Sequence, residues 1–431
     1  MSNKKNIVAN NQDFWSYVKR QYKKNKAAVA SYYVILFLVF IAIFADFLAN
    51  EKPLIAKYND TIYFPALKDY SVNLGLSDWP PELLNVSWQD LEYDYVIWAP
   101  IPYLPQNLDF DNAQSVGPFD DQNVISTRWR HWLGTDELGR DVLSGMIHAT
   151  RIALSVGVIS MTIASFIGII FGAFAGFFGD DKIKMSLIRV VLNIIGLGLA
   201  FFYAFSMRSY TIAEAAGESL FSLFISLSIS LIIFLFIMTI MNLLAGQLKK
   251  LPFLGKRVRV PIDIIISRLI EVQISIPVLI LIISVVAIVK PSIIWIMLII
   301  GLTRWTGIAR FIRAELLKIR SLEYIEAASA LGFTHLRILF KHAIPNALSP
   351  VLITVAFGIA GAILTEAILS LLGIGVPAET VTWGSLLSLA RHAPSAWWLA
   401  IFPGFAIFIT VTVFNLVGEG LTDALDPRQK K

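Results

Sequence analysis

The segment from Tyr324 to Pro350 carries residue types suited to contact with another protein. Glu326 is followed by two small residues, Ala327 and Ala328, and Gly332 comes four positions later. The alanines let another surface approach closely, the glutamate offers a charge to a partner, and the glycine permits a turn between two helical segments. Taken alone, this pattern is also typical of an amphipathic surface helix that ends at a glycine. A docking function therefore needs support from other segments.

The chain offers no set of residues for catalysis of its own. A phosphate-binding loop needs a glycine, four residues, then Gly-Lys and a hydroxyl residue; Gly255-Lys256-Arg257 lacks the leading glycine and the hydroxyl. The absence of cysteine excludes disulfides and thiolate metal sites. Five histidines are scattered without the spacing of a zinc site: His131, His148, His335, His342 and His392. We expect no cofactor, no metal and no enzymatic activity.

Composition places most of the chain in a membrane. Apolar residues make up 56% of the sequence and charged residues 16%, whereas soluble domains average about 45–50% and about 25%. A spanning helix needs about 20 mostly apolar residues. Eight stretches meet that requirement: 31–48, 152–178, 187–207, 219–245, 267–289, 291–310, 347–372 and 396–417. We therefore predict an all-α integral membrane protein, a polytopic bundle of about eight transmembrane helices.

The distribution of charge predicts the orientation of these helices. The N-terminal segment 1–30 is basic, so the positive-inside rule places it in the cytoplasm, followed by the first transmembrane helix at 31–48. Residues 49–147 contain 15 acidic and 6 basic residues and are predicted to lie outside the cell. The basic loop 249–259 is predicted to lie inside. Eight crossings would return the C-terminus to the cytoplasm.

Several residues within the predicted helices have mechanical or polar interest. Gly168, Gly172 and Gly176 recur every four residues, which allows close helix packing in lipid. Pro277 is expected to bend its span and to line a pathway or contact a partner. Glu366 is an intramembrane carboxylate, expected to line a pathway or contact a partner, unless it is solvated near the outer interface.

The segment beginning at Tyr324 resembles the EAA loop of ATP-binding cassette importer permeases, in the order and spacing of its glutamate, alanines, glycine and Pro345. Four further segments resemble the dipeptide and oligopeptide branch of that family, in its C-type permease subunit: HWLGTDELGRDVLS at 131–144, EAILSLLGIG at 366–375, Trp383-Gly384, and 397–428. The resemblance covers about 131–180 and 261–428.

The resemblance implies an inner-membrane permease of a prokaryote, with both termini cytoplasmic, that forms a translocation path for di- or oligopeptides. It implies coupling to ATPases through the loop 311–346, with Glu326, Ala327, Ala328, Gly332 and Pro345 as the coupling residues. Its expected partners are a second homologous permease, two ATP-binding cassette ATPases that hydrolyse ATP, an extracytoplasmic binding protein and membrane lipid, with no nucleic acid. Related systems carry nickel chelates or opines, which remain alternative substrates, and a secondary transporter or a membrane scaffold is an alternative class.

The chain departs from the family in two places. The permease core, 148–182 and 261–428, is interrupted by residues 183–260, which contain two extra predicted spans beside the six of the family. We expect this pair to lie at the periphery and contact lipid. The outer segment 49–130 is rich in tryptophan, tyrosine and proline, which predicts a folded region that either receives a binding protein or packs on its own protein.

Overall fold

The computed structural model describes residues 16–73, 75–84, 86–251, 253, 255–289 and 291–425. The basic residues Lys4 and Lys5 and the C-terminal Arg428, Lys430 and Lys431 lie outside this part of the chain. Two compact units are present. The first comprises residues up to 158 together with 359–424, and the second comprises residues 159–358.

The predicted helical membrane fold is confirmed. Seven helices in the described residues are long and apolar enough to cross a membrane. Their bounds are α2 Lys26–Ile43, α5 Val142–Phe178, α6 Leu187–Phe201 with its π-helical continuation Phe202–Ser206, α8 Leu220–Leu248, α11 Ile293–Ile319, α15 Ser349–Leu371 and α17 Trp398–Leu425. An eighth candidate is the pair α9 Ile262–Ser275 and α10 Val278–Val286, which is bent by 80°.

The bend between α9 and α10 lies where the proline was expected to act. Pro277 precedes α10, and the residue before it, Ile276, is in an extended conformation. A proline disfavours helical geometry in the residue before it and donates no backbone hydrogen bond. The predicted span 267–289 is thus a broken helix, and Gln273 near the break donates hydrogen bonds to the backbone oxygens of Leu302 and Thr303 on α11.

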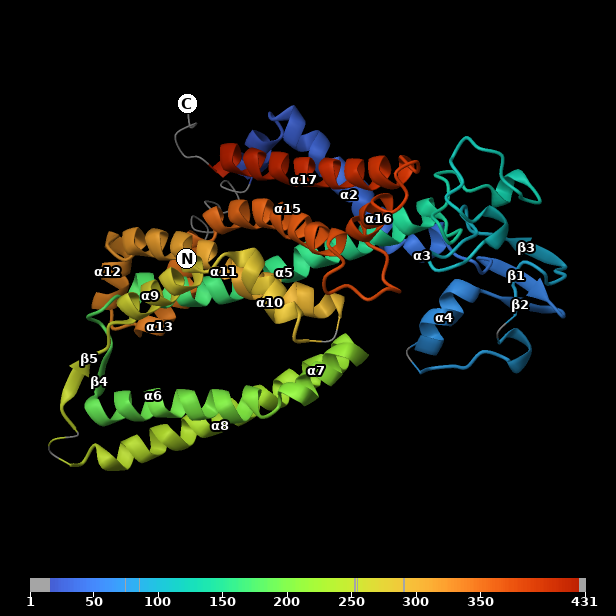
Figure 1. Cartoon of the computed structure of the whole chain (residues 1–431). Helices are drawn as coiled ribbons and strands as arrows, with labels where there is room; N and C mark the ends of the chain where they lie inside the picture. Colours follow the sequence, from blue (N-terminus) through green and yellow to red (C-terminus); the bar gives the residue numbers. More distant parts are fainter. Residues whose placement is uncertain are drawn as a thin grey trace. The chain divides into compact units, whose positions relative to one another are not determined.

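The first unit contains a small folded region between α2 and α5. After the short helix α3 Ala45–Leu48, strand β1 Ile55–Tyr58 pairs antiparallel with β2 Thr61–Tyr63 and β3 Tyr95–Ile97. Helix α4 Pro65–Asn73 lies beside this sheet (Figure 1). Three 3₁₀ turns follow, at Pro81–Leu83, Phe110–Asn112 and Thr127–Trp129. The aromatic outer segment is therefore folded rather than an extended linker.

Transmembrane helices of the first unit pack around small residues. Ala149 and Ala153 on α5 meet Ile363 and Ala367 on α15, and Trp383, the first residue of α16 Trp383–Ala390, completes this buried cluster. The alanines let the helices approach closely, and the larger side chains fill the space that remains between them.

Residues 183–260, predicted to be an insertion, contain a helical hairpin in the second unit. Helix α6 runs along α8, and α7 Ser209–Glu218 lies at the end between them (Figure 1). Asn193 of α6 accepts a hydrogen bond from Asn242 of α8 at 3.0 Å. At the other end, strands β4 Lys184–Ser186 and β5 Arg257–Arg259 pair antiparallel. The hairpin is anchored to the core where Ile212 and Leu223 pack against Trp295 and Leu298 of α11.

Glycines set the distance between α5 and α11 in the second unit. A Cβ atom at Gly168, Gly172 or Gly176 would lie 2.5–2.8 Å from atoms of α11, including backbone oxygens of Trp305, Ala309 and Arg313. Real Cβ atoms essentially never come this close to backbone. The two helices are therefore in backbone contact over two turns of α5, which requires residues without a side chain at these positions.

We predict that Gly172→Ala separates α5 from α11 and destabilises the protein by about 1–3 kcal/mol, the usual range for overpacking. The matched control is Gly307→Ala on α11, where nothing lies within 4 Å of the added Cβ. This control should leave stability unchanged or raise it slightly, because alanine favours the helix. The measurement is the thermal unfolding temperature of both variants in detergent; equal stability of the two would contradict the contact.

Candidate functional site

The hairpin after α11 is built around Gly332. Helix α12 Glu323–Ala330 ends where the N–H of Phe333 donates to the carbonyl of Ala328 and the N–H of Gly332 donates to that of Ser329. These two bonds form a Schellman motif, whose turning residue needs a left-handed conformation. Gly332 has φ +80°, so the residue predicted to turn the chain does so. Thr334 then caps α13 His335–Ile338 through the N–H of Arg337.

One side of this hairpin is exposed and apolar. Leu331, Leu336 and Phe340 are 75%, 52% and 57% exposed, although leucine and phenylalanine side chains are usually buried. Glu326 and Ala327 are also exposed and belong to the same hairpin. This combination of apolar residues with exposed charges, Glu326 among them, is typical of a protein docking surface.

The opposite side of the hairpin anchors it to its own protein. Ile325, Ala328 and Ile338 are buried, and so is Leu339 in the π-helical turn Leu339–Ala343. Of the two predicted coupling alanines, only Ala327 is thus available to a partner. Pro345 lies at the start of α14 Ile344–Ala347 and is exposed.

Two further contacts fix α11 within the second unit. Arg313 donates a bidentate pair of hydrogen bonds to Asp263 of α9, with 2.7 Å between Nη2 and Oδ2. The guanidinium and the carboxylate match in geometry, which makes such pairs strong and specific. The glycine face of α5 packs on the same part of α11. The hairpin therefore extends directly from a helix that two neighbours hold in place.

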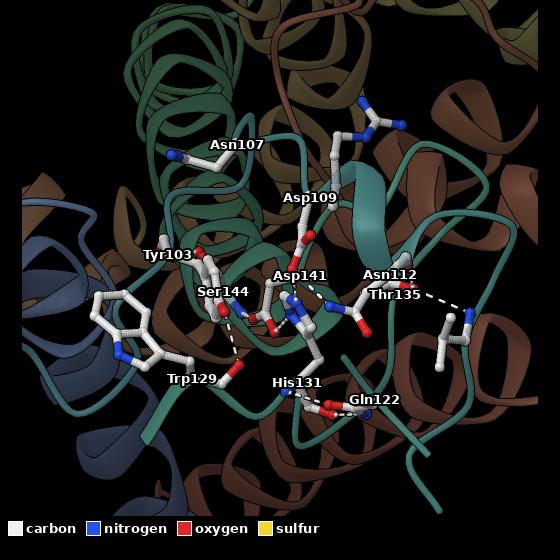
Figure 2. Close-up of polar contacts among 12 residues, drawn as sticks. Tyr103, Asn107, Asp109, Asn112, Gln122, Trp129, His131, Thr135, Asp141 and Ser144 are labelled. Atoms are coloured by element: carbon white, nitrogen blue, oxygen red, sulfur yellow. Dashed lines mark hydrogen bonds and ion pairs between the residues drawn. The ribbon is translucent and has the colours of Figure 1, made fainter. Parts of the chain in front are cut away.

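A second polar site lies in the first unit, centred on His131 (Figure 2). The imidazole is fully buried, with Nδ1 2.8 Å from Asp141 and Nε2 3.1 Å from Asp109. Ionised carboxylates only accept hydrogen bonds, so both ring nitrogens must carry protons to satisfy this geometry. The ring also stacks on Tyr103 at 4.4 Å between centroids.

Burial works against a charged His131, but its two carboxylate partners outweigh this effect and raise its pKa above the ordinary value. Burial similarly opposes the charge of Asp109, yet hydrogen bonds from His131 and Asn112 lower its pKa. For Tyr103, burial and the charges of both carboxylates act in the same direction and raise the pKa of the phenol. The three shifts describe one cluster that stabilises an imidazolium between two carboxylates.

The cluster also fixes the start of α5. Asp141 accepts a hydrogen bond from the N–H of Ser144 at 2.6 Å, which caps the helix, and the hydroxyl of Ser144 donates to the carbonyl of Tyr103. Arg140 pairs with Asp136 at 2.6 Å. The charged residues just before α5 therefore pair locally and cap the helix.

Residues of separate motifs meet at the same end of the first unit. Glu366 is 1% exposed and accepts a hydrogen bond from the hydroxyl of Ser370 at 2.5 Å. Thr382, the cap of α16, hydrogen-bonds the same carboxylate. The indole of Trp383 donates to the carbonyl of Met146 on α5, at 3.2 Å. Glu366 therefore ties α15 to α16 from inside the protein rather than being solvated at an interface.

These segments enclose a cavity of 250 Å³. Its walls come from the start of α5, the end of α15, the loop 373–381 and α16, with Arg140, Asp136 and Ser370 among its lining residues. Sequence reasoning identified the motifs but not their convergence. It treated His131 as one of several scattered histidines. The sequence feature that could have identified His131 was its position in the motif at 131–144, ten residues before Asp141, which caps α5.

Comparison with known proteins gives two family matches. The profile of the binding-protein-dependent transport system inner membrane component matches residues 253–431, and that of the N-terminal TM domain of oligopeptide transport permease C matches residues 13–70. The first match contains the hairpin around Gly332. The second includes the first span, which the sequence resemblance did not cover.

Curated relatives extend over most of the chain. The peptidoglycan transport system permease protein YejE of Agrobacterium fabrum is 26% identical, with 95% of this chain and 92% of the relative covered. The inner membrane ABC transporter permease protein YejE of Escherichia coli is 27% identical, with 97% of both covered. The dipeptide transport system permease protein DppC of Alkalihalophilus pseudofirmus is 28% identical over 70% of this chain and 73% of the relative.

We predict that the His131 cluster makes stability fall at alkaline pH. Because the pKa of His131 is raised on folding, its stabilisation is complete below the ordinary histidine pKa of about 6.5 and is lost as pH rises through the raised value. Because the pKa of Asp109 is lowered, its contribution is present above about pH 4 and is lost only as pH falls through that lowered value. Stability should therefore be greatest between about pH 4 and 6.5.

The test compares thermal unfolding of the wild type, His131→Gln and His392→Gln between pH 6 and 9. His131→Gln should cost about 3 kcal/mol at pH 6, since it leaves Asp141 buried without its charge partner. It should also flatten the pH dependence. His392 is exposed, so its variant serves as the control. A wild-type slope that persists in His131→Gln would refute the assignment.

Proposed function

Since this chain belongs to the family of binding-protein-dependent transport system inner membrane components, we propose that it is the permease subunit of an ATP-driven peptide importer. It is a multi-pass inner-membrane protein. Members of this family are permeases and do not themselves hydrolyse ATP. The observation that carries the proposal is the hairpin α12–α13, which lies within the matched region and exposes an apolar face beside Glu326.

The relatives' names favour peptides as the transported class. They refer to peptidoglycan transport in one case and to dipeptide transport in another, and a peptide is the chemistry that these cargoes share. An oligopeptide permease of Bacillus subtilis, 28% identical over 70% of this chain, agrees with this assignment. These names support peptides over nickel chelates or opines.

The assembly that we propose contains this chain, a second homologous permease, two ATP-binding cassette ATPases and an extracytoplasmic binding protein. The exposed hairpin would insert into a groove of one ATPase, with Leu331, Leu336 and Phe340 supplying apolar contact and Glu326 a charge. Apolar side chains at the centre of an interface supply most of its binding energy, and charges at its edge provide orientation. ATP hydrolysis would take place in these partners.

Movement of the hairpin would be transmitted through helices rather than loops. The hairpin connects α11 with α15, and α11 is held by the glycine face of α5 and by the Arg313–Asp263 pair. Helices α5 and α15 are each continuous and contribute residues to both compact units. A displacement of α11 by the ATPases would therefore be passed to helices whose other ends form the cavity of the first unit.

A contact within the first unit supports eight membrane crossings. The amide of Asn25, at the start of α2, donates to Asp423, near the end of α17, at 3.2 Å. Both helix ends must then lie on the same side of the membrane, which requires an even number of crossings. Seven candidate spans in the described part of the chain are unbroken, so the bent pair α9–α10 would supply the eighth. The basic loop 249–259 and the N-terminal charges support the cytoplasm as that side.

The inserted hairpin α6–α8 is proposed to lie at the periphery in contact with lipid. Exposed hydroxyls on α8 are satisfied by their own helix: Ser228 donates to the carbonyl of Phe224 and Thr239 to that of Leu235. The surrounding exposed side chains are large and apolar, such as Phe224 and Phe236. A surface of this kind requires no hydrogen-bonding partner, which suits hydrocarbon.

We predict that Gly332→Val uncouples transport from ATP hydrolysis. Valine strongly disfavours the left-handed conformation that Gly332 adopts, so the hairpin would lose its turn. Gly332→Asn is the matched control, because asparagine tolerates this conformation. In reconstituted complexes, Gly332→Val should lower peptide uptake at least about tenfold, while Gly332→Asn retains most activity. Glu326→Lys should weaken ATPase binding. Normal uptake by Gly332→Val would contradict the proposed coupling role of the hairpin.

The proposed topology predicts the accessibility of introduced cysteines, which are unambiguous because the chain has none. Ile125 is 95% exposed in the outer segment, and Ile125→Cys should react with a membrane-impermeant maleimide added outside spheroplasts. Lys256→Cys, in the basic loop, should react only after the membrane is opened. Labelling of Lys256→Cys from outside would contradict the topology in which α6 and α8 both cross the membrane.

A further inference from the structure

The cavity of the first unit contains a cation with unused hydrogen-bonding capacity. Arg140 lines the cavity. Its Nε donates to Asp136 Oδ2 at 2.6 Å, and among the described residues Asp136 is its only side-chain partner. A guanidinium has five N–H donors in a planar fork. The donors on the two terminal nitrogens are therefore available to a ligand.

The loop that carries Arg140 is rigid. The carboxylate of Asp136 accepts the backbone N–H groups of Leu138 and Arg140, both at 2.9 Å. Gly139 has φ +79°, and a Cβ there would lie 1.9 Å from the backbone oxygen of Asp109. The loop is thus held by its own carboxylate and by the backbone of Asp109, which lies directly against Gly139. A fixed guanidinium loses less entropy on binding than a mobile one.

The acidic groups near Arg140 already have cationic or N–H partners. Asp136 accepts three hydrogen bonds in its own loop. Asp141 pairs with the imidazole of His131 and caps α5, whose N-terminus carries a partial positive charge. Asp136 engages only the Nε of Arg140, so an incoming anion would meet the two terminal nitrogens of the guanidinium.

The rest of the cavity wall suits a short organic chain. Val142, Val381, Leu386 and Leu389 supply apolar surface, and Ser385 lies among them. The volume of 250 Å³ is just below the range of about 300–1,000 Å³ typical of small-molecule pockets. It therefore suits a fragment of a peptide, such as its last one or two residues, better than a whole oligopeptide.

We propose that this cavity binds the carboxyl-terminal end of a peptide, with Arg140 receiving the carboxylate through its terminal nitrogens and the apolar wall receiving the last side chain. The inference rests on the proposed function as a peptide permease. Arginine forms bidentate, charge-assisted hydrogen bonds with carboxylates, which neither an amide nor an ester can reproduce. Peptides with a free carboxyl terminus should therefore bind more tightly than their amides.

The test uses a Ser388→Cys variant in the complete transporter complex without its binding protein. Ser388 lines the cavity. The rate of its reaction with a small maleimide is measured against increasing trialanine or trialanine amide. Trialanine should slow labelling at concentrations roughly tenfold lower than the amide, as expected for loss of hydrogen bonds to a charged group. Arg140→Gln in the same background should abolish this tenfold preference.

Two controls keep the comparison specific. Arg128→Gln changes an exposed arginine of the same segment outside the cavity and should preserve the preference. Arg140→Lys retains the charge beside Asp136 but not the fork, and should show a smaller preference. Each result is the ratio of the concentrations at which the two ligands slow labelling of one variant. A general loss of stability would affect both concentrations and would leave this ratio unchanged.

Several outcomes would overturn the proposal. These are no labelling of Ser388→Cys, no protection by either ligand, equal protection by both, or a preference that survives Arg140→Gln. A preference that appears only when the binding protein is added would assign the carboxylate to that protein instead. ATP-dependent uptake of trialanine by the same preparation, with binding protein present, tests the proposed function separately. Uptake without carboxylate-dependent protection would refute the cavity assignment alone.

Discussion

The backbone contact between α5 and α11 is the interaction on which the coupling that we propose depends. With glycine at positions 168, 172 and 176, the helices meet without intervening side chains, so neither can slide or tilt without a clash. A contact through long side chains would absorb small displacements by changes of rotamer. A contact through backbone atoms transmits these displacements to the neighbouring helix. This explains how a surface hairpin at the end of α11 can influence α5, a helix of 37 residues that contributes to both units.

The transmembrane helices were predictable because long apolar segments have few stable alternatives in a membrane. Their ends were less predictable. Helix α5 begins at Val142, ten residues before the predicted span. The prediction missed these residues because the first turns of the helix contain polar side chains. His148 and Arg151 hydrogen-bond to the carbonyls of Ala49 and Ala42, contacts that lie about a hundred residues away in sequence. A window of hydropathy contains no information about such partners. The bend at Pro277, by contrast, follows from local sterics and was predicted.

The same distinction applies to the candidate sites. The turn at Gly332 could be predicted because a Schellman motif is formed by neighbouring residues, and glycine is the residue that it favours. The exposure of Leu331 and the burial of Ala328 could not, since they depend on how the hairpin packs. The cavity beside Arg140 is formed by segments from Pro105 to His392. No local pattern indicates that Arg140 and α16, which are far apart in the sequence, line the same cavity.

Polar groups are satisfied differently in the first unit and in the hairpin α6–α8, and this difference accounts for how the hairpin can coexist with the coupling path that we propose. In the first unit, several polar side chains bind partners distant in sequence, as Arg151 does with Asp46, so that one change would disturb several elements. In the hairpin α6–α8, polar groups bind within the hairpin itself: Asn242 bonds Asn193, and Arg208 donates to Ser230 at 2.8 Å. The hairpin is attached to α11 through apolar packing and through a hydrogen bond from the hydroxyl of Ser292, which caps α11, to the carbonyl of Ala216 in α7. An element of this kind adds membrane-embedded surface without altering the hydrogen bonds on which the coupling path depends.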